Sequence, residues 1–323
     1  MKAAVRYQYG SAEVINIEEV EKPEPGNKEV LIRVIYTTVN RTDCAILTGK
    51  PFIMKLMLGF PKPKKKIPGT VFSGIVEETG SNVNLFKAGD RVWGFGDNGI
   101  SSQAEFFTYP EKKNILKLPT DISLEQAAAA IEGAHYALNF INKVNLKQGD
   151  KVLINGATGA IGSAALQFVK YYGGYVTAVC KGRDNHVVKS IGADEVIDYT
   201  KDDFTQKRAK YDFIFDTVGK SRFSKCKHLI KRGGAYISSE LGPNMENLFL
   251  SVTTGFGSNK KVKFPVPLHH KKSMEFTMDL MKTGKFNPLI DKNRYSLNEI
   301  GDAYKYVLTG EKTGNVLVSI QKE

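Results

Sequence analysis

Three glycines spaced three residues apart form the strongest chemical motif of the sequence. Gly156, Gly159 and Gly162 lie between an apolar run that favours a strand, 151–155, and an amphipathic run that favours a helix, 161–172. Because glycine has no side chain, the loop backbone can approach a pyrophosphate closely, and the N–H groups and dipole of the following helix attract negative charge. The flanking strand and helix are the context that supports this interpretation. The sequence therefore predicts a dinucleotide-binding loop made of Gly156, Thr158, Gly159, Ala160, Ile161 and Gly162.

The residues after the next predicted strand, 175–180, indicate which dinucleotide is bound. An NAD site usually carries Asp or Glu here, since a carboxylate accepts a hydrogen bond from the ribose 2′-hydroxyl. This chain has Lys181, Gly182 and Arg183 instead. Two cations suit a 2′-phosphate, which arginine binds with two parallel hydrogen bonds. The pattern favours NADPH; the alternative is that these are ordinary exposed loop charges, with Asp184 directly following.

The elements around the motif alternate between strand and helix. This alternation predicts a parallel sheet with helices on both faces. The expected strands are 151–155, 175–180, 196–198, 211–216 and 235–239, and the expected helices are 161–172, 185–191 and 221–230.

The first third of the chain has a different character, with short β-like runs separated by turns that contain Gly and Pro. The last predicted strand, 315–320, cannot close a domain alone, so we expect the C-terminal stretch to return to the N-terminal domain. The fold class is α/β. We assign residues 1–122 and 266–323 to a discontinuous β-rich domain and 123–265 to the dinucleotide-binding domain.

Composition excludes several classes of protein. With 41% hydrophobic and 25% charged residues, the 323-residue chain is typical of globular proteins, and no apolar run approaches the roughly 18 residues of a membrane helix. The net charge of +12 comes from dispersed lysines, which predicts a basic solvated surface and no specific nucleic-acid partner. Three scattered cysteines argue against a disulfide framework and fit a reducing compartment. The N-terminus shows no secretion signal, so we expect a soluble, cytoplasmic protein without integral membrane association.

Further landmarks follow one another in a characteristic order. They are Val39-Asn40-Arg-Thr-Asp43 ending at Gly49, Pro68-Gly69 with Gly74 and Gly80, Lys87–Gly94, the glycine loop, Ser190–Asp194 with Val196–Tyr199, and Asp216–Gly219. Over essentially its whole length, the chain resembles the zinc-free quinone oxidoreductase branch of the medium-chain dehydrogenase/reductase superfamily. The resemblance implies a GroES-like β-rich catalytic domain, a Rossmann doubly wound parallel-sheet domain, and a cleft between them. It also implies that Tyr199 helps to hold NADPH and that Val218 lies near the nicotinamide half.

The same resemblance implies chemistry without a metal. The zinc-using branch places a cysteine, a histidine and a second cysteine where this chain has Asn40, Thr70 and Glu132. Three oxygen side chains from such different elements make a poor zinc site. Without zinc, alcohol oxidation loses its Lewis acid. Hydride transfer to an activated alkene or quinone needs only a donor to the developing oxyanion.

Four side chains are candidates for catalysis. Asn40 matches an asparagine that faces the nicotinamide in relatives, and its amide could donate to a substrate carbonyl; its alternative role is to stabilise the turn before Asp43. Tyr136 stands where dehydrogenase relatives keep a threonine, and its hydroxyl could donate to the substrate. Glu132 and His135 are candidate proton carriers, since burial can tune both types, and a structural role is the alternative for each. Several relatives carry Tyr or Lys where this chain has Cys44-Ala45, so their usual proton donor is missing.

The apolar, methionine-containing segment 51–60 precedes a run rich in lysine and proline, 62–66. Ordinary core packing is one interpretation of the segment. It could also line the substrate cleft, because soft side chains adapt to varied apolar ligands, or touch a membrane surface beside the lysines.

Together these patterns predict an enzyme that uses NADPH to reduce a small, apolar, electrophilic quinone or α,β-unsaturated carbonyl without a metal. One alternative is an NADPH-dependent reductase of ketones or alcohols. Another is an NADPH-binding stress or RNA-binding protein with negligible turnover. Because relatives often pair cofactor domains through an edge strand, here 261–266, we expect a homodimer.

Overall fold

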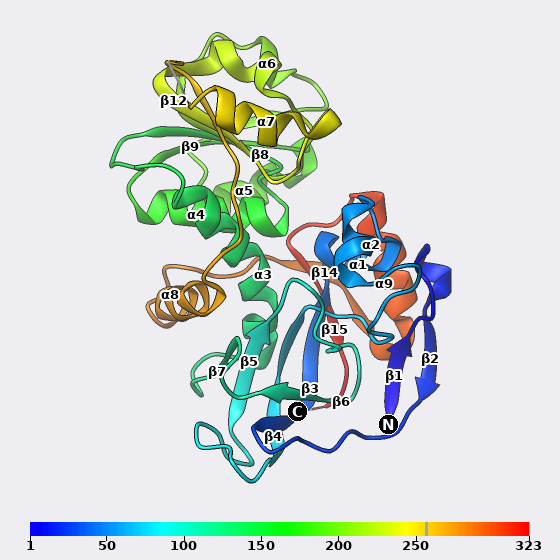
Figure 1. Ribbon diagram of the computed structural model, residues 1–323. Helices are drawn as coiled ribbons and strands as arrows, with labels where there is room; N and C mark the ends of the chain where they lie inside the picture. The colour runs from blue at the N-terminus through cyan, green and yellow to red at the C-terminus, as the bar shows by residue number, and fades with distance from the viewer. Residues whose placement is uncertain (256–257, 323) are drawn as a thin grey trace. The chain divides into compact units, whose positions relative to one another are not determined.

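The computed structural model describes residues 1–255 and 258–322, which form two compact units (Figure 1). The β-rich unit contains Met1–Glu132, His270–Lys282 and the chain from Ile290 on. The α/β unit contains Gly133–His269 and Thr283–Leu289. No helix among the described residues is both long enough and apolar enough to cross a bilayer.

The β-rich unit is built on a seven-stranded sheet. Its order is β14-β15-β3-β4-β5-β7, and β6 also pairs with β3. The strands are β3 (Glu29–Val39), β4 (Val71–Thr79), β5 (Arg91–Phe95), β6 (Phe106–Pro110), β7 (Ile115–Lys117), β14 (Ile290–Ser296) and β15 (Asn315–Ser319). β15 runs antiparallel to β3, with Val316 opposite Val39, so the C-terminal stretch does return to the N-terminal sheet.

Smaller elements complete this unit. They are the hairpin β1 (Lys2–Val5) and β2 (Asn16–Glu19) and the helices α1 (Arg41–Thr48), α2 (Ile53–Leu58), α8 (His270–Lys282) and α9 (Ile300–Thr309). Helix α9 contributes Ala303, Tyr304 and Val307 to a buried apolar cluster that also contains Leu47 of α1 and Val316 of β15. This packing holds α1 and the start of β15 together, and both elements carry candidate site residues.

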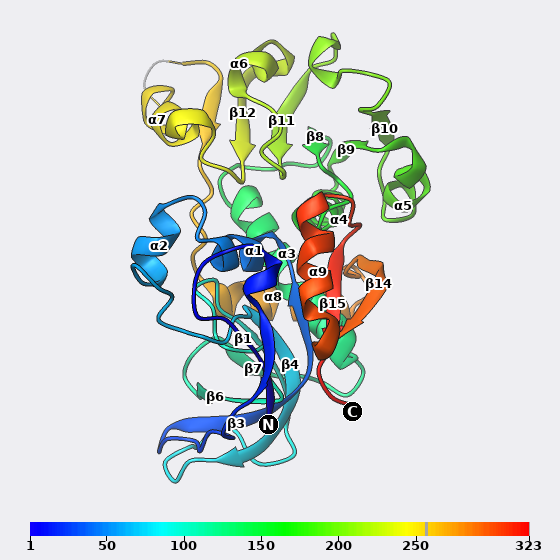
Figure 2. The same ribbon diagram turned by 90° about the vertical axis from the view of Figure 1, so that its right-hand side faces the viewer.

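The α/β unit has a six-stranded parallel sheet of order β10-β9-β8-β11-β12-β13. The strands from β10 to β12 lie side by side in Figure 2. The strands are β8 (Lys151–Asn155), β9 (Tyr175–Cys180), β10 (Glu195–Asp198), β11 (Tyr211–Asp216), β12 (Ile230–Ser238) and β13 (Lys261–Lys263). The order reverses between β8 and β11. Right-handed crossovers therefore place helices on opposite faces, with α4 (Ala160–Tyr171) and α5 (Asn185–Ser190) on one, and α6 (Phe223–Cys226) and α7 (Glu246–Thr253) on the other (Figure 1).

One predicted helix is replaced by two shorter turns. The sequence favoured a helix over 221–230, and the structure has α6 over Phe223–Cys226, a 3₁₀ turn over Lys227–Leu229, and β12 from Ile230. Ile230 pairs with Tyr211 of β11, and both side chains are buried in one apolar cluster. The pairing of Ile230 therefore ends the helical stretch one residue before the predicted limit.

Helix α3 (Leu124–Ile141) is shared between the two units. Its first half, up to Glu132, belongs to the β-rich unit because the Ser73 hydroxyl donates to the carbonyl of Leu124 (2.6 Å) and Arg294 pairs with Glu125 (2.8 Å). The boundary between the units thus lies within α3, whereas the sequence analysis placed it at 122/123.

Candidate functional site

The glycine loop between β8 and α4 has no space for side chains at two of its three glycines. Gly156 has φ of +81°, and a Cβ there would lie 2.4 Å from Cγ1 of Val218. A Cβ on Gly162 would lie 2.1 Å from the carbonyl oxygen of Gly156. Glycine is therefore required for the tight turn and for the close approach of α4 to the loop. This is the close-packed backbone that a pyrophosphate-binding loop needs.

A buried carboxylate holds together the carboxyl ends of the strands beside this loop. Asp216, at the end of β11, accepts hydrogen bonds from the Asn155 amide (3.0 Å), the Ser221 N–H (2.9 Å) and the Tyr236 hydroxyl (2.9 Å). The network ties the end of β8 to the end of β11, where the strand order reverses. Val218 lies two residues after Asp216, and 37% of its surface is exposed. Its apolar side chain can therefore contact a ligand beside the glycine loop.

The predicted 2′-phosphate residues lie at the ends of β9 and β10. Lys181 is partly buried, and the Arg183 side chain is 59% exposed with Nε 3.8 Å from a carboxylate oxygen of Asp184. The N–H of Tyr199 donates to the carbonyl of Cys180 (3.1 Å), and its side chain is 49% exposed. The structure thus brings Lys181, Gly182, Arg183 and Tyr199 together at the carboxyl ends of β9 and β10.

Asp198, which the sequence analysis did not consider, is the closest acid to Gly182. A Cβ on Gly182 would lie 2.2 Å from its carboxylate. Oδ1 of Asp198 accepts from the hydroxyl (2.7 Å) and the N–H (3.0 Å) of Thr200, and these bonds lower the pKa of Asp198. Asp198 is thus engaged with its own turn through Oδ1.

The catalytic candidates of the β-rich unit converge around Asn40, which is 2% exposed. Nδ2 of Asn40 donates to Oε2 of Glu132 and to Oδ1 of Asn315, both at 3.2 Å. Its backbone N–H donates to Asp43 (2.9 Å), which caps helix α1. The turn-stabilising role and the contact with Glu132 are therefore both present.

The three positions that hold zinc in the metal-using branch also converge. Asn40 contacts Glu132 directly, and the Thr70 hydroxyl donates to the other oxygen of Asp43 (3.0 Å). Asp43 thus links Thr70 to Asn40, and the side chains at the three positions are an amide, a hydroxyl and a carboxylate. Within residues 1–255 and 258–322, no group of three or more His, Cys, Asp and Glu side chains is placed to hold a metal ion.

A lysine completes this cluster, and the sequence analysis missed it. Nζ of Lys312 lies 3.3 Å from Oδ1 of Asn40 and also donates to the carbonyl of Gly314. The turn that carries it is fixed by buried Asp291, which accepts from the N–H of Thr313 (2.7 Å). The sequence did offer one signal for Lys312, because the last strand was expected to return to the N-terminal domain. Its antiparallel pairing with β3 brings Lys312 and Asn315 close to Asn40.

The cluster perturbs the proton affinities of its members. Burial raises the pKa of Glu132 and of Asp43, and the charge of Glu132 raises the pKa of Asp43 further. Hydrogen bonds from Thr42 and Asn40 and the charge of Lys312 oppose the rise for Glu132. Burial lowers the pKa of Lys312 to about 8, against the opposing charges of Glu132 and Asp291. A pKa of about 8 lets the Lys312 ammonium act as a proton donor more readily than an ordinary lysine.

The other two candidates lie further along α3, in the α/β unit. His135 is completely buried, which disfavours direct contact of its side chain with a ligand, and its backbone carbonyl accepts from the Asn139 amide (2.8 Å). Tyr136 is partly buried, and its ring centroid lies 5.5 Å from that of His135. Tyr136 follows Glu132 by four residues, so the two lie on the same face of the helix.

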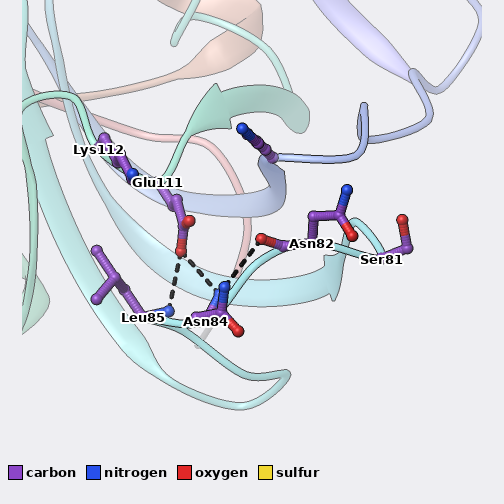
Figure 3. Close-up of a pocket in the computed structure, with 7 residues that line it drawn as sticks. Ser81, Asn82, Asn84, Leu85, Glu111 and Lys112 are labelled. Atoms are coloured by element: carbon purple, nitrogen blue, oxygen red, sulfur yellow. Dashed lines mark hydrogen bonds between the residues drawn. The ribbon is translucent and has the colours of Figure 1, made fainter.

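A surface hollow of about 490 Å³ in the β-rich unit contains none of these residues (Figure 3). Its acid, Glu111, accepts from the N–H groups of Asn84 and Leu85, both at 2.9 Å, and so holds a loop. The lining residues are Lys28, Ser81, Asn82, Asn84, Leu85, Glu111 and Lys112. Because this carboxylate is engaged with its own backbone, the hollow is not the candidate site.

Comparisons with known proteins agree with this architecture. Residues 26–120 match the family described as "Alcohol dehydrogenase GroES-like domain", and residues 191–318 match "Zinc-binding dehydrogenase". The "Chloroplast envelope quinone oxidoreductase homolog" of Arabidopsis thaliana is 31% identical, covering 96% of this chain and 95% of the relative. The "NADPH-dependent alkenal/one oxidoreductase, chloroplastic" of the same plant is 29% identical, covering 98% of this chain and 79% of the relative. The solved quinone oxidoreductase of Coxiella burnetii has a TM-score of 0.88 at 24% identity, covering 99% of both chains.

Proposed function

Since the chain belongs to the quinone oxidoreductase branch of the medium-chain dehydrogenase/reductase superfamily, we propose that it uses NADPH to reduce a quinone or an α,β-unsaturated carbonyl without a metal. Membership of this family identifies the chain as an oxidoreductase. The use of NADPH, the substrate class and the independence from metal are what we propose.

The residues at the edge of the parallel sheet fit NADPH. The loop containing Gly156 and Gly162 leaves no room for a Cβ, which suits a backbone that packs against a pyrophosphate. Lys181 and Arg183 would bind the 2′-phosphate, and exposed Tyr199 and Val218 offer surfaces to the rest of the cofactor. When bound, NADPH supplies the hydride.

The Asn40–Glu132–Lys312 cluster is the observation that carries the proposal of metal-free chemistry. The three zinc positions supply neither thiolate nor imidazole. The Asn40 amide is already bonded to Glu132 and Asn315, and the Lys312 ammonium lies against its oxygen. A second cation would be repelled by this ammonium, so the residues present do not fit zinc.

The same cluster provides what reduction of a conjugated carbonyl needs from the protein. As hydride adds to the electrophilic carbon, negative charge develops on the substrate oxygen. The Lys312 ammonium can donate a hydrogen bond and then a proton to that oxygen. Glu132 favours the charged form of Lys312. Asn40 orients Glu132 and Lys312, and the Tyr136 hydroxyl is the neutral donor of the proposal.

We also assign this activity to a reducing compartment, the cytoplasm. Cys44, Cys180 and Cys226 are buried and free, which suits an environment that keeps thiols reduced.

The deciding experiment compares two rates for one substrate pair. NADPH consumption is measured with an enone and with a quinone, and NADP⁺ reduction is measured with the saturated alcohol that corresponds to the enone. We expect the first two reactions to be faster, because nothing in the cluster acidifies an alcohol as zinc does. Faster alcohol oxidation would overturn the proposal. Salt-sensitive RNA binding without turnover on any of these compounds would also overturn it.

A further inference from the structure

Residues 50–66, here named the amphipathic segment, present large apolar side chains to solvent. The exposed fractions are 61% for Phe52, 49% for Ile53, 59% for Leu56, 58% for Met57 and 65% for Phe60. Helix α2, at the centre of the segment, contains no buried residue. Core packing was therefore the wrong interpretation of this run. Five large apolar side chains exposed within nine residues point to a function at the surface.

The charge of the segment has one sign. It carries six lysines, at positions 50, 55, 62, 64, 65 and 66, and the chain contains no Asp or Glu from Cys44 to Val76. Lys50, Lys62 and Lys64 are exposed. A concentrated positive charge beside apolar side chains complements a surface that is negative outside and apolar beneath.

The exposed side chains are held on a fixed support. The Tyr9 hydroxyl donates to the carbonyl of Gly59 (2.7 Å), and the N–H of Arg6 donates to the carbonyl of Lys66 (2.9 Å). The ammonium of Lys65 donates to the carbonyl of Gly99 (2.7 Å). These bonds tie the segment to the β-rich unit at several points, so its apolar surface exists before any partner binds.

The two ends of the apolar run meet. The ring centroids of Phe52 and Phe60 lie 6.0 Å apart in an edge-to-face arrangement. The exposed apolar side chains are therefore brought together over α2, which is the arrangement that enters the headgroup layer of a bilayer while flanking lysines contact lipid phosphates.

We propose that the amphipathic segment docks the protein on the surface of an anionic lipid bilayer. The apolar side chains enter the interfacial layer, and the lysines bind the negative headgroups. An acidic protein would satisfy the lysines, but it would have to provide a matching apolar groove for five protruding side chains, which a fluid lipid interface provides without a fixed shape. This function goes beyond the proposed reduction, since docking requires neither cofactor nor substrate.

Co-sedimentation of the full-length protein with lipid vesicles tests the proposal. We expect binding to vesicles rich in phosphatidylglycerol and little binding to pure phosphatidylcholine vesicles, with the bound fraction falling as salt rises. Since each lysine near an anionic surface contributes about fivefold in affinity, Lys62→Gln with Lys64→Gln should weaken binding roughly 10- to 30-fold. Leu56→Ser with Phe60→Ser should also release the protein.

Matched variants control for charge, hydrophobicity and folding. Lys271→Gln with Lys272→Gln removes two exposed lysines of α8, and Leu85→Ser removes an apolar side chain that is 49% exposed; both should bind vesicles like the wild type. Melting temperatures of all variants confirm that they are folded. Absence of wild-type binding to anionic vesicles would overturn the proposal, as would unchanged binding of both segment variants. A third result would also overturn it. If Leu56→Ser with Phe60→Ser bound anionic vesicles normally and polyglutamate displaced the protein from them, the attraction would be electrostatic alone.

Discussion

The ammonium nitrogen of Lys312 lies 3.3 Å from the amide oxygen of Asn40, although 272 residues separate them. Asn40 occupies a position that the metal-using branch gives to a zinc ligand, and Lys312 comes from the turn before the last strand. The protein thus provides its own positive charge within the cluster that replaces the metal site.

Lys312→Met should lower kcat for enone reduction roughly 10- to 1000-fold, as expected for loss of a principal donor to the developing oxyanion. Lys305→Met, which removes an exposed lysine of α9 paired with Asp302, is the matched control and should leave kcat unchanged. Steady-state kinetics on both variants provide the measurement. An unaltered kcat in Lys312→Met would exclude this residue from the mechanism.

The wild-type kcat should fall as pH rises past about 8, because burial lowers the pKa of Lys312 to about 8 and only its ammonium form donates. The groups that act on it are Glu132 of α3, Asp291 of β14, and Cys44 and Arg41 of α1. Glu132→Gln removes the main influence that raises this pKa, so the alkaline decline should move to lower pH. Glu125→Gln, on the same helix, should leave the profile in place. A shift to higher pH in Glu132→Gln would refute the coupling.

Arg183→Ala should weaken NADPH binding far more than NADH binding. Loss of a charge-assisted contact to the 2′-phosphate should cost about 1.5–3 kcal/mol. Fluorescence titration with both cofactors measures the effect, and Arg208→Ala, which removes another exposed arginine of the α/β unit, is the control. Equal affinities of the wild type for NADPH and NADH would contradict the assignment.

Activity should survive removal of divalent metals. The donors at the three former zinc positions are an amide, a hydroxyl and a carboxylate, and a lysine lies beside them. Dialysis against a chelator followed by elemental analysis and assay should show full turnover without stoichiometric zinc. Loss of zinc together with activity, and recovery of both on adding zinc, would disprove metal independence.

The protein should be a homodimer that pairs along β13, the strand at one end of the parallel sheet. Light scattering should then give about twice the 35.8 kDa of one chain. Val266, just beyond β13, is 44% exposed, so Val266→Asp should favour the monomer, whereas Leu85→Asp should not. A monomer mass for the wild type at micromolar concentration would rule out this prediction.

The sequence predicted much of the α/β unit because its signals are local. Gly156 and Gly162 mark one turn, and alternating strands and helices define the parallel sheet around it. The helical stretch predicted over 221–230 ends at Leu229 because Ile230 pairs with a neighbouring strand, and this contact is not written in the segment itself.

The candidate site was harder to predict because it depends on pairing between distant strands. Asn40 and Glu132 were identified from the resemblance, but their direct contact could not be read from either segment. Lys312 appeared as one of many dispersed lysines, and only the register of β15 on β3 reveals that it meets Asn40. The exposure of the amphipathic segment also emerged only with the fold, since its composition equally suits a core.

The return of β15 to β3 has a consequence for how the protein is made. Residues 36–39 of β3 pair with β15 on one side, and Asn40 and Asn315 are 275 residues apart. The edge of β3 that faces β15 therefore has no partner there until the ribosome has almost finished the chain, although β4 already lies on the other side. The α/β unit is nearly contiguous, from Gly133 to His269, and can fold during translation. The nascent protein therefore carries an open strand edge for most of its synthesis, and its yield in the cell should depend on chaperones that shield such edges more than its final stability suggests.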